Sequence, residues 1–452
     1  MSVDITFTAD QYQHLLSLAQ TEIESGAVLL AHLETMHDRS RLIVTDIIEV
    51  PQEAYTRRTW NALEITSEGY VHALKEAART EAIAIWTHTH PGLASNTSPS
   101  IHDVHVNDEL RDLFADRSAS GHYGYLVIGH DDAGLTFTGQ LDDQVIDRLS
   151  SIGNRFVFRR AQHSTAPPIP DLFSRNIKAF GPDIQGVISE LTIAVVGAGG
   201  TGSAVAEQLV RLGVRKLAII DPDHLSASNI TRVYGSTEAD VGRPKVDALG
   251  DWLQKIAPSL ELTRIHGTIT TESVARQLLS ADIVFGCTDD NAGRLRLSRL
   301  PYFYQLPVID CGVKLDSDED SGIRGIFGRI TLVYPGEACL ICRDRIDIAL
   351  ATAEQRSAME QSALEKEGYA AALPGVEPAV VAFTSLVAAT SVAELLERLI
   401  GYGDSAVPSE LILRIHDRRI SLNSQAPTTG HYCDPHKPPR HSEMFLGLNW
   451  TS

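Results

Sequence analysis

The feature that most constrains the fold is a strand, a glycine-rich loop and a helix that follow one another along the chain. Residues Ile193–Val196 are β-branched and small apolar residues, a run typical of a buried parallel strand. The loop after them carries Gly197, Gly199, Gly200 and Gly202. An amphipathic stretch, Ser203–Leu212, and a second apolar strand, Lys216–Ile220, lead to Asp221. The unit therefore predicts backbone N–H groups that face a phosphate at a helix N-terminus.

On its own, the glycine pattern also fits a dinucleotide-dependent oxidoreductase with Asp221 on a ribose. The next run, Asp221–Arg232 (DPDHLSASNITR), is not part of a nicotinamide fingerprint, and Asp240–Lys245 (DVGRPK) and Cys287–Asp289 (CTD) follow it. In order and spacing these motifs resemble the GxGGxG, DxDxVxxSNLxRQ, DVGxxK and CTDN motifs of the ThiF/MoeB superfamily, the adenylating domain shared with ubiquitin-activating enzymes. The resemblance runs from about Ser174 to His436. It implies an α/β fold with a Rossmann-like, doubly wound sheet.

The resemblance also implies which residues bind ATP. Those it assigns to the nucleotide, in addition to the glycines, are Asp221, Asp223, Asn229, Arg232 and Lys245. Asp221 would hold the ribose hydroxyls, and Arg232 and Lys245 would neutralise the phosphates. Asp289 follows an apolar strand pattern at Ile283–Phe285 and would hold Mg²⁺.

A lead-in segment precedes the glycine loop. Residues Ser174–Gly181 (SRNIKAFG) match the family's RQIxLFG pattern. In homodimeric members this arginine reaches into the partner's nucleotide site, so the resemblance implies that Arg175 acts in trans and that the adenylating domain forms a homodimer. Two positions depart from the family: Val233 replaces a glutamine and Asp290 replaces an asparagine. Neither change removes a charged group.

The five cysteines divide into two groups. Cys287 and Cys311 follow apolar strand runs, so we expect them to be buried and unreactive. The motifs CLIC and CDPH contain Cys339, Cys342, Cys433 and His436. Family members often carry CxxC in both places around a structural zinc ion, which implies a four-ligand zinc site here. The crossover segment, residues 343–376, contains no cysteine, so we expect the adenylate to pass to a partner or to another nucleophile without a standard thioester.

The chain is long enough for two or three domains. Residues 1–155 predict helices at Ala9–Glu22 and Ser67–Arg79 among several strands, which indicates a mixed α/β domain. Residues 156–172 include the proline-rich run AQHSTAPPIP and predict a linker. Residues 173–452 form the adenylating domain with its C-terminal zinc segment.

A second chemical site is predicted in the first domain. His88 and His90 project from one side of an extended segment after a buried strand, and Asp103 follows within the same region. Two imidazoles and one carboxylate leave a position on zinc open for water, as in catalytic zinc sites. Zinc would lower the pKa of that water to about 7, and a nearby carboxylate must then take its proton. Glu24, just before the first predicted strand, is the candidate base. The alternative is a set of surface histidines, because the chain has 17 histidines.

The run HTHP…SxxD, with Glu-Ser-Gly-Ala ahead of an apolar strand, resembles the JAMM/MPN metallo-isopeptidase family. The resemblance implies that His88, His90 and Asp103 bind zinc and that Glu24 is the general acid/base. Ser100 would stabilise the tetrahedral oxyanion. Ser98 has the family's usual distance from the histidines, but only Ser100 has the SxxD spacing to the aspartate.

Composition limits the partners. The formal net charge of −19 repels phosphate backbones and anionic lipid, so we expect neither nucleic-acid nor membrane binding. The N-terminus lacks a signal-peptide pattern, and the most apolar stretch, Ala379–Ala393, is too short to cross a bilayer. An odd number of cysteines with a CxxC motif favours a reducing, cytoplasmic compartment.

These features together predict a two-headed enzyme of a bacterial ubiquitin-like pathway. One head would cleave after the C-terminal glycine of a ubiquitin-like protein with an extended tail, and the other would adenylate the exposed carboxylate with ATP. A conjugating-enzyme-like protein could be a further partner. One alternative is activation of a sulfur-carrier protein or peptide for biosynthesis. Another is a scaffold that binds ubiquitin-like proteins with one head inactive.

Overall fold

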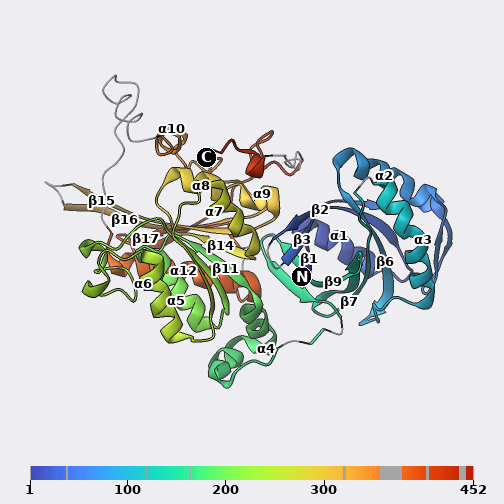
Figure 1. The fold of residues 1–452 in the computed structure, drawn as a ribbon, viewed down its shortest axis with the longest axis horizontal. Coiled ribbons are helices and arrows are strands. Elements are labelled where there is room, and N and C mark those ends of the chain that lie inside the picture. The colour runs from blue at the N-terminus through green and yellow to red at the C-terminus, as the bar shows by residue number, and fades with distance from the viewer. Residues whose placement is uncertain are drawn as a thin grey trace. The chain divides into compact units, whose positions relative to one another are not determined.

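The computed structural model describes residues 2–36, 39–118, 120–162, 164–165, 167–318, 322–356, 379–403, 407–436 and 444–450. The chain forms two compact units, residues 1–166 and 167–452 (Figure 1). Most of the crossover segment predicted to lack a thioester cysteine, from residue 357 to 376, lies outside the described residues. No helix among the described residues is long and apolar enough to span a bilayer.

The first unit is built on one eight-stranded sheet of order β1-β3-β2-β6-β7-β8-β9-β10. These strands are β1 (Ser2–Thr8), β2 (Gly26–Thr35), β3 (Arg39–Glu49), β6 (Ile83–Leu93), β7 (Gly124–Asp131), β8 (Gly134–Leu141), β9 (Gln144–Ile152) and β10 (Phe156–Arg160). Strands β1 and β9 also pair, in parallel, so the sheet closes on itself. Because β10 pairs with β9, residues 156–160 belong to this sheet and not to the linker expected from residue 156.

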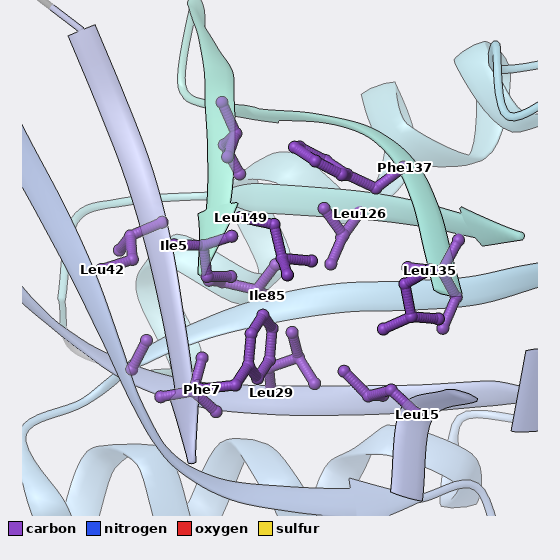
Figure 2. Packing of buried hydrophobic residues seen from close by; sticks show 14 of the residues in the cluster. Ile5, Phe7, Leu15, Leu29, Leu42, Ile85, Leu126, Leu135, Phe137 and Leu149 are labelled. Atoms are coloured by element: carbon purple, nitrogen blue, oxygen red, sulfur yellow. The ribbon is translucent and has the colours of Figure 1, made fainter. Parts of the chain in front are cut away.

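Two helices cover the two faces of this sheet. Helix α1 (Ala9–Ala19) packs on one face and α2 (Glu68–Thr80) on the other, and α3 (Ile101–Arg117) follows β6. Alternate residues of β2 point to opposite faces: Leu29 joins the cluster with α1, and Val28 joins the cluster with α2. Figure 2 shows the first cluster, in which Leu15, Leu29 and Phe137 come from three elements far apart in the sequence.

A short hairpin of strands β4 (Tyr55–Arg58) and β5 (Leu63–Ile65) lies between β3 and α2. The sequence patterns predicted α1, α2 and most of the longer strands, but they did not predict this hairpin, β1 or α3. The strands of the hairpin have only four and three residues, which is too short for hydrophobic periodicity to give a signal.

The second unit also has an eight-stranded sheet, of order β13-β12-β11-β14-β15-β16-β17-β18. The strands are β11 (Thr192–Val196), β12 (Lys216–Ile220), β13 (Glu261–Ile265), β14 (Ile283–Gly286), β15 (Val308–Asp318), β16 (Gly322–Val333), β17 (Glu410–Arg414) and β18 (Arg419–Asn423). Neighbours from β13 to β15 are parallel, and neighbours from β15 to β18 are antiparallel. The parallel part of this doubly wound sheet therefore contains five of its eight strands, and an antiparallel extension supplies the rest.

Helices cover both faces of this sheet, as a doubly wound fold requires (Figure 1). They are α4 (Ser174–Glu190), α5 (Gly200–Leu212), α6 (Lys245–Ile256), α7 (Glu272–Ala275), α8 (Asn291–Leu297), α9 (Leu300–Tyr304), α10 (Ile348–Ala353) and α12 (Val381–Ile400). Helix α12 packs along α5 and buries Val387 and Leu395. The apolar stretch at Ala379–Ala393 is thus a helix of the globular core with one buried face.

Candidate functional site

The glycine loop lies at the carboxyl end of β11, and at two of its positions a residue with a side chain would not fit. Gly197 has φ 95°, and a Cβ on it would lie 2.6 Å from the carbonyl oxygen of Cys287. A Cβ on Gly202 would lie 1.7 Å from the carbonyl oxygen of Gly197. Helix α5 begins at Gly200, earlier than the expected Ser203, because the glycines themselves form its first turn.

Asp221 at the end of β12 holds this loop in shape. The backbone N–H of Ala198 donates to Asp221 Oδ2 (2.7 Å), and that of Asp223 donates to Oδ1 (2.8 Å). Burial raises the pKa of the Asp221 carboxyl, while Lys245 and the two amides oppose the rise. The carboxylate that the sequence assigned to ribose therefore also fixes the backbone that would face the phosphates.

Two predicted cations lie beside the loop. Lys245, the first residue of α6, has its Nζ 2.7 Å from Asp223 Oδ2 and 3.7 Å from Asp221 Oδ1. The side chain of Arg232 passes within 3.3 Å of the Cβ position of Gly200, and its Nη1 donates to the Ser228 carbonyl (2.9 Å). The structure thus gathers the glycines, two carboxylates and two cations at one edge of the sheet.

The remaining predicted nucleotide residues have different surroundings. Asn229 accepts a hydrogen bond on Oδ1 from the Ser226 N–H (3.1 Å), so its side chain closes the turn before Arg232. Asp289 is exposed on the loop after β14. Its neighbour Asp290 caps α8 by accepting from the Gly293 N–H (2.5 Å), which gives the departure from the family asparagine a structural role.

Arg175 lies far from the loop of its own chain. The next residue, Asn176, donates its Nδ2 to the carbonyl of Leu212 (3.4 Å), and Gln185 donates to the same oxygen (2.9 Å). Leu212 ends α5, whereas the glycine loop begins it, and 13 helical residues span about 20 Å. That distance is well beyond the reach of an arginine side chain.

A second cluster contains three of the four predicted zinc ligands. Cys339, Cys342 and Cys433 lie with His431, whose Nδ1 is 3.4 Å from each of the three sulfurs. The sulfurs of Cys342 and Cys433 are 3.7 Å apart. A hydrogen bond from Cys433 lowers the pKa of the Cys339 thiol to about 4, although burial opposes this, so its thiolate form is favoured. Three sulfurs and one imidazole at these spacings fit a tetrahedral zinc site.

His436 does not join this cluster, which corrects the predicted ligand. It is exposed, and its backbone N–H donates to Asp434 Oδ1 (3.0 Å). His431, two residues before Cys433, takes the fourth position because the chain turns between Thr428 and Asp434. The signal in the sequence was the position of His431 two residues before Cys433, but the CDPH motif placed His436 at a similar distance after it.

The other two cysteines face one another. Cys311 is buried as expected, with 2% exposed, whereas Cys287 is only partly buried, which corrects the expectation for that residue. A hydrogen bond with Cys311, together with burial, raises the pKa of the Cys287 thiol well above its usual range. A thiol with a raised pKa is a poor nucleophile. Neither residue has the properties of an acceptor for an activated carboxylate.

In the first unit, the predicted ligands His88, His90 and Asp103 do lie together. Asp103 Oδ1 is 3.2 Å from His88 Nε2, and Oδ2 is 3.5 Å from His90 Nε2. The Nε2 of His88 is buried and makes no hydrogen bond to any described residue. The Nδ1 of His90 is 2.7 Å from the carbonyl oxygen of Asn96, so in the neutral imidazole Nδ1 carries the proton and Nε2 keeps its lone pair. These donor atoms fit a metal ion.

Glu24 lies beside the same cluster. It is 8% exposed, and burial raises the pKa of its carboxyl, although His88 and His90 oppose the rise. Ser100 is the N-cap of α3: its Oγ accepts from the Asp103 N–H (3.2 Å), and Asp103 Oδ2 accepts from the Ser100 N–H (2.7 Å). In this cap the Ser100 hydroxyl oxygen accepts a hydrogen bond, so its proton stays available to be donated to another group.

Comparison with known proteins identifies the family of the second unit. Residues 173–425 match the model of the ThiF family, which is more than half of the chain, so the chain belongs to this family. Its adenylyltransferase-type unit therefore has the Rossmann-like ThiF/MoeB fold.

Curated relatives match parts of the same region. The molybdopterin-synthase adenylyltransferase of Escherichia coli (strain K12) is 29% identical over 172 residues, which are 38% of this chain and 65% of that protein. The ubiquitin-like modifier-activating enzyme 5 of Bombyx mori is 29% identical over 209 residues, which are 43% of this chain and 49% of that protein. The chain thus spans about half to two-thirds of the length of these relatives. Among solved structures, E. coli MccB with ATP has 18% identity and a TM-score of 0.46, covering 59% of this chain and 75% of that one.

Proposed function

We propose that the second unit uses ATP to adenylate the C-terminal carboxylate of a ubiquitin-like or sulfur-carrier protein. The observation that carries this is the set of groups at the carboxyl edge of the parallel strands, where the glycine loop, Asp221, Arg232 and Lys245 lie together. Family membership supports it. So do the names of the relatives, one an adenylyltransferase and the other an activating enzyme for a ubiquitin-like modifier.

In the proposed reaction, a carboxylate oxygen bonds to the α-phosphorus of ATP and the α–β phosphoanhydride bond breaks, which releases pyrophosphate. The loop amides would hold the phosphates. Arg232 and Lys245 would offset their charge, and Lys245 must leave Asp223 to do so. Asp289 would hold Mg²⁺, which when bound would offset the charge of the phosphates.

Carrier-dependent exchange between ATP and labelled pyrophosphate tests this proposal. Lys245→Ala and Asp289→Ala should each lower the exchange rate about 100-fold, because each removes a charge from a preorganised site. Lys255→Ala is the matched control, since Lys255 is an exposed lysine in the last turn of the same helix. A wild-type chain that binds NAD and catalyses no exchange would support the oxidoreductase alternative instead.

We also propose that the first unit is a zinc peptidase of the JAMM/MPN type that cuts after the C-terminal glycine of the same class of carrier. His88, His90 and Asp103 would hold the zinc, which when bound acidifies water and polarises the scissile carbonyl. Glu24 would take the proton from the attacking water and deliver it to the leaving amine, a task that its raised pKa favours. The Ser100 hydroxyl would donate to the developing oxyanion.

Cleavage of a ubiquitin-like domain fused through Gly–Gly to a reporter protein tests the peptidase. Glu24→Gln should abolish cleavage while zinc content is unchanged, and His88→Ala should lose both. His105→Ala is the matched control, because His105 is an exposed histidine on α3 paired only with Glu109 among the described residues. Normal cleavage by Glu24→Gln would show that Glu24 is not the base.

We further infer that Cys339, Cys342, His431 and Cys433 hold a structural zinc ion. Four protein ligands leave no open position, so this site would stabilise the C-terminal segment and take no part in chemistry.

A further inference from the structure

The β4–β5 hairpin contacts the short segment that carries Glu24. The backbone N–H of Glu24 donates to the carbonyl of Thr59 (2.8 Å), and its carbonyl accepts from Arg58 Nε (2.8 Å). Two residues later, the N–H of Gly26 donates to the hydroxyl of Tyr55 (3.0 Å). Both backbone polar groups of Glu24 are therefore paired with the hairpin and not with the main sheet.

Arg58 makes the central contacts of this arrangement. Besides the bond to Glu24, its Nη2 donates to Ser25 Oγ (2.5 Å) and its Nη1 donates to Gln52 Oε1 (3.0 Å). The guanidinium carbon lies 4.6 Å from the centre of the Tyr55 ring. Hydrogen bonds from all three nitrogens and the contact of one face with the Tyr55 ring fix the orientation of the planar guanidinium, and a lysine cannot make the same set of contacts.

The ladder of β2 and β6 does not reach Glu24. Its first pair is Gly26 with His88, so Glu24 precedes the strand. Between them, Ser25 exchanges two bonds with Thr89: its N–H donates to Thr89 Oγ1 and its carbonyl accepts from the Thr89 N–H, both at 2.9 Å. Thr89 lies between the two histidine ligands. The Glu24–Ser25 segment is therefore fixed on one side by the ligand strand and on the other by the hairpin.

We propose that Arg58 is a positioning residue of the peptidase site, which fixes the backbone of Glu24 so that its carboxylate faces the site formed by His88, His90 and Asp103. The inference rests on the peptidase function proposed above. Proton transfer depends steeply on placement, and a displacement of about 1 Å can cost about 100-fold in rate. Arg58 would thus act on catalysis without touching the metal or the substrate.

The test compares Arg58→Ala with Arg57→Ala in the full-length, zinc-loaded chain. Arg57 is the matched control because it lies on the same hairpin, is 58% exposed and pairs only loosely with Glu64 (3.4 Å). On the Gly–Gly fusion probe, Arg58→Ala should lower kcat about 10- to 100-fold with KM within about 2-fold and zinc content unchanged. Arg58→Lys keeps one cationic donor but not the planar fork, so it should recover only a small part of the loss, and Arg57→Ala should match the wild type.

Amide hydrogen exchange gives a second readout that does not need activity. The peptide covering residues 22–27 should exchange faster in Arg58→Ala than in the wild type and in Arg57→Ala. Unchanged kcat or unchanged exchange in Arg58→Ala would overturn the inference. So would a loss of activity that follows loss of zinc. If wild type and Glu24→Gln are equally inactive, the peptidase proposal fails, and the exchange result alone decides whether Arg58 fixes the segment.

Discussion

Replacing His431 by alanine should remove zinc from the cysteine cluster, whereas replacing His436 should leave it bound. Zinc–sulfur bonds of about 2.3 Å and zinc–nitrogen bonds of about 2.0–2.1 Å place neighbouring ligand atoms of a tetrahedron about 3.5–3.8 Å apart. The observed separations are 3.4 Å from His431 Nδ1 to each sulfur and 3.7 Å between Cys342 and Cys433. The cluster therefore needs almost no rearrangement to hold the ion.

The size of the effect follows from the ligand count. Changes to residues that merely support a ligand weaken zinc binding about 10- to 100-fold, so loss of a ligand should cost at least about 100-fold, or about 2.7 kcal/mol. Because metal binding stabilises only the folded state, the melting temperature of His431→Ala should also fall. His436→Ala removes an exposed imidazole and should change neither quantity.

Zinc per chain, measured after dialysis against a weak chelator, together with thermal unfolding, provides the assay. The metal site proposed for the first unit must be emptied in both variants by His88→Ala so that only the cysteine cluster is counted. Retention of zinc by His431→Ala together with its loss from His436→Ala would refute the assignment. It would show that the C-terminal segment folds around His436.

Further predictions concern the second unit. Burial alone would raise the pKa of Glu410, but Arg345 and other hydrogen-bond partners lower it to about 2. The lowered pKa stabilises the folded state above the unfolded pKa of 4.5, and this stabilisation is lost as the pH falls from about 4.5 to about 2. Glu410→Gln should therefore reduce the free energy of unfolding at pH 7 by about 3 kcal/mol and flatten the acid limb of a urea-denaturation series. Mixing inactive Arg175→Ala with inactive Lys245→Ala should restore about a quarter of the exchange activity, since half of the dimers would hold one intact site of two; no recovery would show that Arg175 does not act in trans. Incubation with ATP and carrier should give no thiol-reducible adduct on the chain, and an adduct that Cys311→Ala abolishes would make Cys311 catalytic.

Local chemistry explains what the sequence could predict. The backbone at Gly197 and the crowding at Gly202 exclude any side chain, so the glycines must appear in the sequence and mark the loop. The apolar strands on either side of this loop are similarly visible as short β-branched runs. His88 and His90 stand two residues apart on one strand, so their common direction was also readable.

Contacts between distant segments could not be predicted in this way. His431 and Cys339 are 92 residues apart, and which histidine joins the cysteines depends on how the C-terminal turn closes. Arg58 contacts the carbonyl of Glu24 across 34 residues, from a hairpin too short to give a periodic pattern. No local property distinguishes Arg58 from Arg57, and both His431 and His436 lie within three residues of Cys433.

The sequence by itself thus determined the ThiF-type loop, because steric needs within a few residues impose it, and it predicted that His88, His90 and Asp103 lie together and that Cys339 pairs with Cys342. Only the tertiary structure decided the fourth ligand of the cysteine cluster, the distance of Arg175 from its own loop and the partners of Glu24. Those depend on chain closure over long separations, where side chains of the same type compete and packing of the whole unit selects one.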